Sequence, residues 1–235
     1  MSVLYAIPTP LGGAAADALP ASALDTVRGV RDFVAENPKA ARAFLASLKM
    51  PCPIAEISIV RLDEHTPADA VPALLAPLRA GRPLGLLSEA GCPAIADPGA
   101  ALVEAAHREK FRVVPLVGPS SIVLALMASG LEGQRFSFCG YLPRDAKERA
   151  RRIREIEQRS RREGETQIFI ETPYRNDVLI AALLEACAPS TKLCLASDLT
   201  LQSERVATRT IAEWRQSAVK TGKRPTVFLL LARHP

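Results

Sequence analysis

The chain has 235 residues, 48% of them hydrophobic and 23% charged, and its formal net charge at pH 7 is +5. A chain of this length can bury a sizeable core, either as one large domain or as two smaller ones. Its apolar runs are shorter than the roughly 20 residues that a membrane-spanning helix needs, which excludes a membrane-embedded protein. The N-terminal segment lacks the basic residues of a signal peptide and is interrupted by Pro8. We therefore expect a cytoplasmic protein without a membrane partner.

The five cysteines are scattered along the chain without a CxxC pair. An odd number of cysteines without an export signal is typical of reduced thiols in the cytoplasm. We therefore expect neither a disulfide framework nor a metal site.

The first half of the chain predicts strands and helices in alternation. Short apolar runs rich in β-branched residues predict strands at 3–7, 30–34, 57–62, 84–87 and 113–117. Helical patterns lie between most of these runs, at 24–30, 40–48, 68–79 and 100–110. Such alternation is typical of an α/β domain with a mostly parallel, Rossmann-like sheet covered on both faces.

A Val-Gly-Pro segment at 117–119 predicts a domain boundary, which divides the chain into 1–118 and 119–235. The second half begins with a predicted helix at 120–129, and further helices are expected at 146–162 and 176–187. Strands are expected at 135–141, 167–170, 193–196 and 227–231. Because strand and helix do not alternate regularly here, we expect a smaller α+β domain with a mixed sheet.

The loops after the parallel strands are the first places to look for a site, because ligands of such sheets bind beyond the carboxyl ends of the strands. The loop after the first strand reads "IPTPLGGAAAD", and its two glycines allow close approach of a ligand to the backbone. Neither a GxGxxG nor a GxxxxGK[ST] phosphate-binding pattern is present. On its own, the loop fits a plain strand-to-helix turn equally well.

The loop after the second strand carries Glu36, Asn37, Pro38 and Lys39. Asn37 followed by Pro38 is typical of a helix start, with the asparagine as the cap and the proline at the first helical position. A capped turn also holds charged side chains rigidly at a cleft, so the structural and the functional interpretations are compatible.

The loop after the fourth strand, "SEAGCPAIADPG" at 88–99, consists almost entirely of small residues. It has neither a lysine nor a run of glycines for a phosphate. A ligand without phosphate, read by backbone groups, would suit it. S-adenosylmethionine (SAM) is such a ligand, because its ribose hydroxyls and sulfonium can meet amides and carbonyls. A plain connecting loop is the alternative. Ser120 and Ser121 lie at the start of the next helix, where they either cap the helix or bind a ligand carboxylate through the free N–H groups of its first turn.

Six segments in order resemble the tetrapyrrole-methylase superfamily of SAM-dependent methyltransferases. They are "LYAIPTPLG" at 4–12, "LLSEAGCPAIADPG" at 86–99, "VVPLVGPSSIVLALMASGL" at 113–131, "RFSFCGYLP" at 135–143, "IFIETPYR" at 168–175 and "LASDLT" at 195–200. The branch most similar to them methylates the ribose 2′-hydroxyl of a cytidine in small-subunit ribosomal RNA. The similarity extends over essentially the whole chain.

The resemblance implies a two-domain enzyme, usually a homodimer, that holds SAM in the cleft between its domains. The residues that it assigns to SAM are Leu11, Gly91, Cys92, Ile95, Ser120, Ser121, Glu171, Thr172, Leu199 and Thr226. Many of these contacts would use backbone atoms.

The sequence departs from the ribosomal branch in three acceptor-side motifs, which begin at Glu36, Ser88 and Glu171. Cofactor use is therefore better supported than the identity of the substrate. We expect Glu36 or Glu89 to act as a base on the acceptor hydroxyl. Lys39 and Arg175 are expected to orient the acceptor or its phosphates.

The segment 144–163 contains nine basic and five acidic residues. It predicts a helix that packs one narrow face, which carries Ala146, Ala150, Ile153, Ile156 and Glu157. Its exposed arginines, among them Arg151 and Arg152, either form i,i+4 pairs on a solvated surface or contact an RNA backbone. Two other functions stay open: a methylase of the same fold with a small acceptor such as a tetrapyrrole, and a SAM-binding protein with little catalysis.

Overall fold

The computed structural model describes residues 2–217 and 219–233. The chain divides into two compact units, Met1–Ser120 and Ser121–Pro235, here called the N-terminal and the C-terminal unit. This division falls two residues after the predicted boundary, so that Ser120 and Ser121 belong to different units. The C-terminal unit is the smaller of the two, as expected, although by only a few residues.

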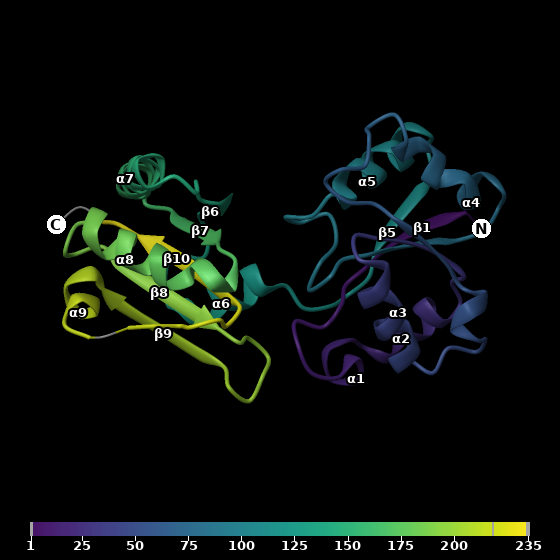
Figure 1. Ribbon diagram of the computed structural model, residues 1–235, viewed down its shortest axis with the longest axis horizontal. Coiled ribbons are helices and arrows are strands. Elements are labelled where there is room, and N and C mark those ends of the chain that lie inside the picture. Colours follow the sequence, from purple (N-terminus) through teal and green to yellow (C-terminus); the bar gives the residue numbers. More distant parts are fainter. Residues whose placement is uncertain (1, 218, 234–235) are drawn as a thin grey trace. The chain divides into compact units, whose positions relative to one another are not determined.

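The N-terminal unit is built on a five-stranded parallel sheet with the strand order β3-β2-β4-β1-β5 (Figure 1). The strands are β1 (Val3–Ile7), β2 (Asp32–Ala35), β3 (Ser58–Arg61), β4 (Leu84–Leu87) and β5 (Arg112–Pro115). The helices are α1 (Ala15–Ala18), α2 (Ala21–Arg28), α3 (Pro38–Ser47), α4 (Ala76–Arg79) and α5 (Gly99–Arg108), with 3₁₀ helices η1 (Ile54–Glu56) and η2 (Val71–Leu75). The predicted parallel α/β architecture is confirmed.

Helices cover both faces of this sheet (Figure 1). Ile7 and Phe33 point to the face that packs against α1, α2 and α3. Leu4 and Val34, three positions and one position away on the same two strands, point to the face that packs against η2, α4 and α5. Because successive side chains of a strand alternate between faces, strands buried on both sides are apolar at every position.

Prolines explain the main departure from the predicted elements of this unit. One helix was expected at 68–79, but the structure has η2 followed by α4. Pro72 and Pro77 each lie at the start of one of these short helices. Proline has no N–H group to donate and is tolerated only in the first turn of a helix, so the segment restarts instead of continuing.

The C-terminal unit is built on a mixed five-stranded sheet with the order β6-β7-β10-β8-β9. Its strands are β6 (Phe136–Tyr141), β7 (Thr166–Ile170), β8 (Lys192–Ser197), β9 (Arg205–Thr210) and β10 (Thr226–Leu231). The pair β6–β7 is parallel, and the other neighbouring pairs are antiparallel. The helices are α6 (Ser121–Ser129), α7 (Ala146–Glu163), α8 (Asn176–Ala186) and α9 (Ile211–Arg215), with the 3₁₀ helix η3 (Pro173–Arg175). The expectation of a mixed sheet is confirmed.

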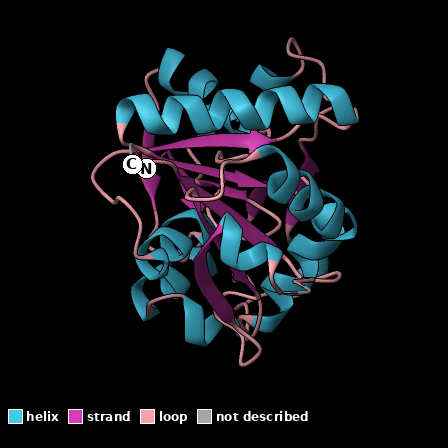
Figure 2. Ribbon diagram, turned by 90° about the vertical axis from the view of Figure 1, so that its left-hand side faces the viewer, coloured by secondary structure: helices cyan, strands magenta, loops and turns pink. Residues whose placement is uncertain are grey.

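Helices α7, α8 and α9 pack on one face of this second sheet around a single apolar core. Phe169 and Phe228 stack at its centre, with their ring centroids 5.8 Å apart. Figure 2 shows α7 as the long helix lying over the strands. The buried face of α7 is carried by Arg149, Ile153 and Ile156, whereas Ala146 is exposed, so the predicted packing face starts one turn too early.

Strand β9 and helix α9 were not predicted from the sequence. The signal for β9 is a β-branched residue at every second position, namely Val206, Thr208 and Thr210. The charged Arg205 and Arg209 on the same strand hide the apolar pattern. Thr210 then caps α9 through a reciprocal pair of hydrogen bonds with Glu213. Among the described residues, no helix is both long and apolar enough to cross a membrane, and the five cysteines are free thiols.

Candidate functional site

The loops that follow β1 and β4 are joined by backbone hydrogen bonds. Thr9 N donates to Gly91 O at 2.9 Å, and Gly91 N donates to Thr9 O at 3.0 Å, which makes an isolated antiparallel bridge. Ser88 Oγ also donates to Gly91 O at 2.6 Å. Thr9 and Ser88 are both buried. The two loops therefore form one rigid structure at the carboxyl edge of the parallel sheet.

The small-residue loop holds an unusual backbone conformation. Gly91, Ala94 and Ala96 all have positive φ angles, of 79°, 65° and 59°. The carboxylate of Asp97 stabilises this path, since its Oδ1 accepts hydrogen bonds from Ala94 N and Gly99 N, both at 2.7 Å. The left-handed backbone conformation costs a non-glycine residue about 1–2 kcal/mol of conformational free energy. The contacts of the loop must therefore stabilise a conformation that Ala94 and Ala96 do not favour.

Three of the residues that the resemblance assigns to SAM lie together in the N-terminal unit. A Cβ added to Gly91 would lie 3.2 Å from Leu11 Cδ2 and 3.6 Å from Pro119 O. Cys92 Sγ lies 3.4 Å from the same Pro119 carbonyl, which directly precedes Ser120. Ile95 belongs to the same loop and is 49% exposed. Folding thus brings Leu11, Gly91, Cys92 and the segment before Ser120 to one place.

This arrangement fits a ligand that is read by the backbone. The glycine allows Leu11 and the Pro119 carbonyl to approach closely, and carbonyl oxygens suit a sulfonium cation. Burial raises the pKa of the Cys92 thiol, so at neutral pH it contributes no negative charge to this region.

On the acceptor side, Asn37 links the loops after β2 and β4. Its Oδ1 caps α3 by accepting hydrogen bonds from Lys39 N at 3.1 Å and Ala40 N at 3.2 Å. Its Nδ2 donates to Glu89 Oε1 at 3.1 Å. The predicted cap is confirmed, and the same side chain orients one of the two predicted bases. Lys39 is exposed.

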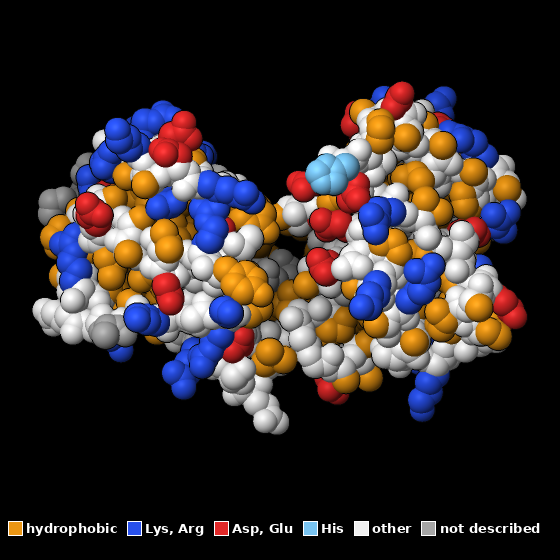
Figure 3. Space-filling view, in the orientation of Figure 1, with side chains coloured by type: hydrophobic (Ala, Val, Ile, Leu, Met, Phe, Trp, Pro, Cys, Tyr) orange, Lys and Arg blue, Asp and Glu red, His pale blue; other side chains and the backbone are white. Residues whose placement is uncertain are grey.

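Carboxylates gather around Glu36. Burial raises the pKa of Glu36, and the nearby charges of Asp97, Glu89, Glu64 and Asp63 raise it further. Figure 3 shows acidic side chains (red) close to a histidine (pale blue) on the surface of the N-terminal unit. In the described part of the chain, neither Glu36 nor Glu89 forms an ion pair. Glu36 is therefore a partly buried carboxyl group that holds its proton to a higher pH than an ordinary glutamate does.

Glu36 and Glu89 were predicted from the sequence, whereas Asp63, Glu64 and Asp97 were not. Asp63 and Glu64 lie just after the end of β3, as Glu36 lies just after the end of β2. The signal was present in the strand ends. To place these carboxylates next to Glu36, the strand order is also needed, and it puts β3, β2 and β4 side by side. No group of three or more histidine, cysteine or acidic side chains among the described residues is arranged to hold a metal ion.

In the C-terminal unit, the remaining residues assigned to SAM collect at one edge of the mixed sheet. Glu171 and Thr172 follow β7, Leu199 follows β8, and Thr226 begins the antiparallel strand β10 between them. Thr226 pairs with Ser197, and their hydroxyl groups are 2.8 Å apart. Ser121 begins α6 in the same unit.

The acidic groups at this second edge are paired with arginines. Arg175 Nη2 lies 3.0 Å from Glu171 Oε2, and the glutamate side chain is only 2% exposed. Arg224 Nε lies 3.6 Å from Asp198 Oδ2. The guanidinium of Arg175, which the sequence assigned to the acceptor, is therefore engaged by a buried carboxylate of its own unit.

Helix α7 carries many basic side chains, and several of them have acidic partners on the same helix. Arg151 and Arg152 both contact Glu155, at 2.9 and 3.4 Å. Arg149 is buried and donates to the backbone carbonyl of Arg144. The i,i+4 pairing predicted for a solvated surface is thus present, while basic groups (blue) remain abundant around this part of the surface (Figure 3).

Known proteins share both the fold and much of the sequence. A solved structure of a cobalamin biosynthetic enzyme, cobalt precorrin-4 methyltransferase, superimposes with a TM-score of 0.60 and 13% identity, covering 98% of this chain and 95% of that one. Ribosomal RNA small subunit methyltransferase I of Vibrio cholerae is 32% identical over 211 residues, which are 90% of this chain and 69% of that protein. The Bacillus subtilis protein of the same name is 31% identical over 91% of this chain and 69% of its own length.

These matches define the class of protein: the chain is a SAM-dependent methyltransferase. It belongs to the family of tetrapyrrole (corrin/porphyrin) methylases, whose family model matches residues 3–214.

Proposed function

We propose that the protein transfers a methyl group from SAM to a ribose 2′-hydroxyl of a cytidine in small-subunit ribosomal RNA. The similarity to ribosomal RNA methyltransferases over nine tenths of the chain supports RNA as the acceptor. The observation that carries the chemistry is the partly buried Glu36 carboxyl group, whose pKa is raised, close to Glu89 at the strand ends. A base of this kind suits a hydroxyl acceptor.

SAM supplies an electrophilic methyl group on its sulfonium. In the N-terminal unit, the proposed binding residues are Leu11, Gly91, Cys92, Ile95 and Ser120, and the close approach of Leu11 to Gly91 supports the first three. In the C-terminal unit they are Ser121, Glu171, Thr172, Leu199 and Thr226. The rigid bridge between Thr9 and Gly91 would keep the binding loop ordered before the ligand arrives, which lowers the entropic cost of binding.

Removal of the hydroxyl proton is assigned to Glu36, with Glu89 as the second carboxylate. A raised pKa makes Glu36 a stronger base than a solvent-exposed glutamate once it is ionised. Asn37 holds Glu89 through its amide and fixes the direction of that carboxylate. Much of the rate would come from the alignment of hydroxyl, methyl carbon and sulfur.

The other acceptor-side roles stay predictions. Lys39 is exposed next to the cap of α3 and is free to approach a phosphate. Arg175 would have to share its guanidinium with Glu171. Arg151 and Arg152 would have to share theirs with Glu155. The cytoplasmic location is expected from the N-terminal segment and the scattered cysteines, and the homodimer from the family resemblance alone. Light scattering after gel filtration measures the oligomeric state.

Incubation with methyl-labelled SAM tests the proposal. Small ribosomal subunits from a strain without the related methylase should take up label, and nuclease digestion should release a 2′-O-methylcytidine. A tetrapyrrole panel serves as the competing substrate set. Label in a tetrapyrrole and not in RNA would overturn the assignment of the acceptor. Tight SAM binding without any transfer would instead identify a SAM-binding protein with little catalysis.

A further inference from the structure

A cavity of about 550 Å³ opens beside Glu89, one of the acceptor-side carboxylates of the N-terminal unit. Its wall is formed by the loop after β1, by α2 and α3, and by Glu89 from the loop after β4. Cavities of about 300–1,000 Å³ are the size that holds small organic ligands. This volume is sufficient for a nucleotide.

The cavity extends along α3. Glu89 lines it and is bound to Asn37, the residue that caps the start of this helix. Lys49 also lines it, two residues after the helix ends. A ten-residue helix is about 15 Å long, so the negative and the positive ends of the cavity are well separated.

The two ends differ in charge. Glu89 belongs to the carboxylate group around Glu36, which would repel a phosphate. At the other end are Lys49, which is exposed and forms no ion pair in the described part of the chain, and Arg28. Arg28 is held by Leu48 O at 2.9 Å and by Asp25, so Lys49 is the freer of the two cations.

The wall between these ends is apolar and contains one aromatic ring. Leu24, Phe44 and Leu48 line it together with Gly12 and Gly13. A Cβ added to Gly13 would meet no atom within 4 Å, so the backbone there faces open space. An apolar, aromatic wall facing a bare backbone suits an unstacked base, which RNA-binding proteins hold against aromatic side chains.

We propose that this cavity holds the acceptor nucleotide of the RNA. The ribose lies along Gly12 and Gly13 with its 2′-hydroxyl toward Glu89, the base lies against Phe44, and the phosphate is reached by the long side chains of Lys49 and Arg28. The nucleotide is therefore taken out of its base stack for methylation. This inference rests on the proposed function, because it assigns the position of that acceptor.

Titration of ¹⁵N-labelled protein with cytidine 5′-monophosphate, and separately with cytidine, tests the inference. Both should shift the amide resonances of Gly12 and Gly13. Lys49→Gln should weaken binding of the monophosphate about tenfold, the usual worth of one charged hydrogen bond, and leave cytidine binding unchanged. Lys49→Arg should retain most of the affinity.

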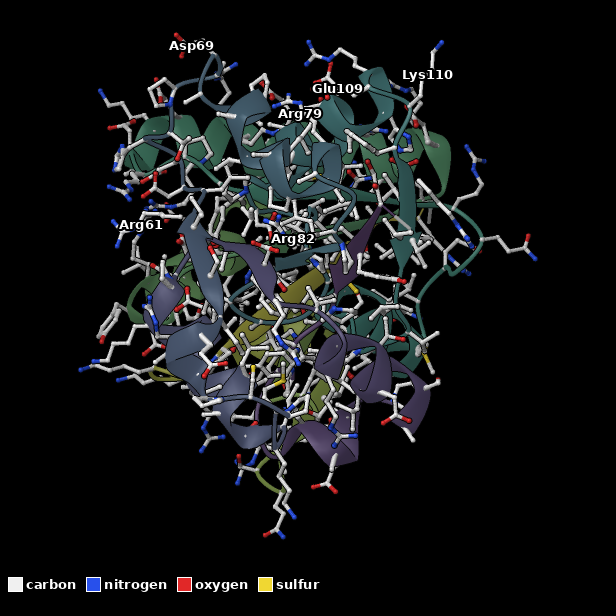
Figure 4. The ribbon with its side chains drawn as sticks, turned by 90° about the vertical axis from the view of Figure 1, so that its right-hand side faces the viewer. Arg61, Asp69, Arg79, Arg82, Glu109 and Lys110 are labelled. Atoms are coloured by element: carbon white, nitrogen blue, oxygen red, sulfur yellow. The ribbon has the colours of Figure 1, made fainter. Side chains whose placement is uncertain are left out.

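Lys110→Gln is the matched control. Lys110 is also exposed, follows α5 of the same unit and has a positive φ of 60°, close to the 55° of Lys49. Figure 4 shows it at the outer edge of this unit. Because the two lysines share a backbone conformation, only the cavity distinguishes them. An equal loss of affinity in both variants, or none in Lys49→Gln, would contradict the inference.

Two further measurements separate this inference from the proposed function. A short RNA that contains the unmethylated target cytidine should displace cytidine 5′-monophosphate from the protein. Failure to compete would mean that the cavity binds a free nucleotide instead of the acceptor. In the methyl transfer assay, Lys49→Gln should raise KM for RNA severalfold with kcat and SAM affinity unchanged. If the protein methylates RNA but nucleotides do not shift the Gly12 and Gly13 resonances, the assignment of the cavity is wrong and the proposed function stands. If nucleotides bind in the cavity but no methyl group is transferred to RNA, the cavity is a nucleotide site and the proposed function is wrong.

Discussion

The carboxyl edge of the parallel sheet and the corresponding edge of the mixed sheet treat acidic side chains differently. In the mixed sheet, Glu171 and Asp198 each face an arginine. In the parallel sheet, Glu36 and Glu89 have no cationic partner among the described residues, and the pKa of Glu36 is raised. A carboxylate that faces an arginine has its charge compensated and serves to hold the fold together. An unpaired, partly buried carboxylate is suited to proton transfer.

Replacement of Glu36 should have the largest effect on activity. Glu36→Gln is expected to lower kcat about a hundredfold or more, which is the usual contribution of a general base. The raised pKa means that the native state favours the protonated form of this residue. The variant should therefore be more stable than the parent at neutral pH, and the gain should vanish as the pH falls below about 4.5.

Kinetics together with thermal unfolding at pH 8 and pH 4 check this expectation. Glu104→Gln, on the exposed side of α5 and next to Arg108, is the control for removal of a carboxylate in the same unit. Unchanged turnover in Glu36→Gln would transfer the role to Glu89, which Glu89→Gln tests in the same assay.

Breaking the buried pair of the mixed sheet should affect stability more than chemistry. Arg175→Gln leaves Glu171 charged and buried without its partner, and we expect a loss of about 2 kcal/mol in the free energy of unfolding, since Arg175 is itself 26% exposed. Urea denaturation measures this loss. The double variant with Glu171→Gln should recover part of it. Arg224→Gln, at the longer and more exposed pair, should cost less than about 1 kcal/mol.

The approach of Leu11 to Gly91 can be tested with two glycines of equal backbone conformation. Gly91 has φ 79° and Gly81 has φ 81°, but only at Gly91 would a Cβ contact other atoms. Alanine should destabilise both sites by about 1 kcal/mol. Only Gly91→Ala should also weaken SAM binding, severalfold, in calorimetry. Equal SAM affinity in the two variants would remove this contact from the binding site.

The smallest expected effect is a shift of the pH profile. Glu64 is exposed, and its charge is one of those that raise the pKa of Glu36. Glu64→Gln should lower that pKa, so that Glu36 stays ionised, and the enzyme active, to a lower pH. We expect the acid limb of kcat/KM to move down by about 0.2–0.5 pH units. Glu56→Gln, on η1, is the control, and an upward shift would contradict the assignment of the limb to Glu36.

Local sequence predicted much of the fold. The apolar runs of β1 and β4 are uninterrupted and bounded by loop residues, and both strands occur at the predicted residues. The helix α7 is as long as its pattern indicated, because Asp145 caps its start and Gly164 ends it in the left-handed conformation. The polar edge strand β9 was not predicted, because its pairing with β8, and not its own hydrophobicity, holds it in the sheet.

The candidate site was predictable only in part. Strand ends pointed to Glu36 and Glu89, since each follows a run that could be recognised as a strand. The neighbours of Glu36 depend on the strand order, and the bridge from Thr9 to Gly91 joins residues far apart in the sequence. No local pattern encodes such contacts. By contrast, Glu171 and Arg175 are only four residues apart, so a local signal for their ion pair was present in the sequence.

The bridge between Thr9 and Gly91 also makes the binding loops observable without any ligand assay. Its two amide protons are donated to carbonyls, so their exchange with solvent requires both loops to separate. A ligand that favours the joined state must slow the exchange of both amides by the same factor, whichever loop it touches. These two backbone positions can therefore report SAM occupancy in variants that have lost all turnover.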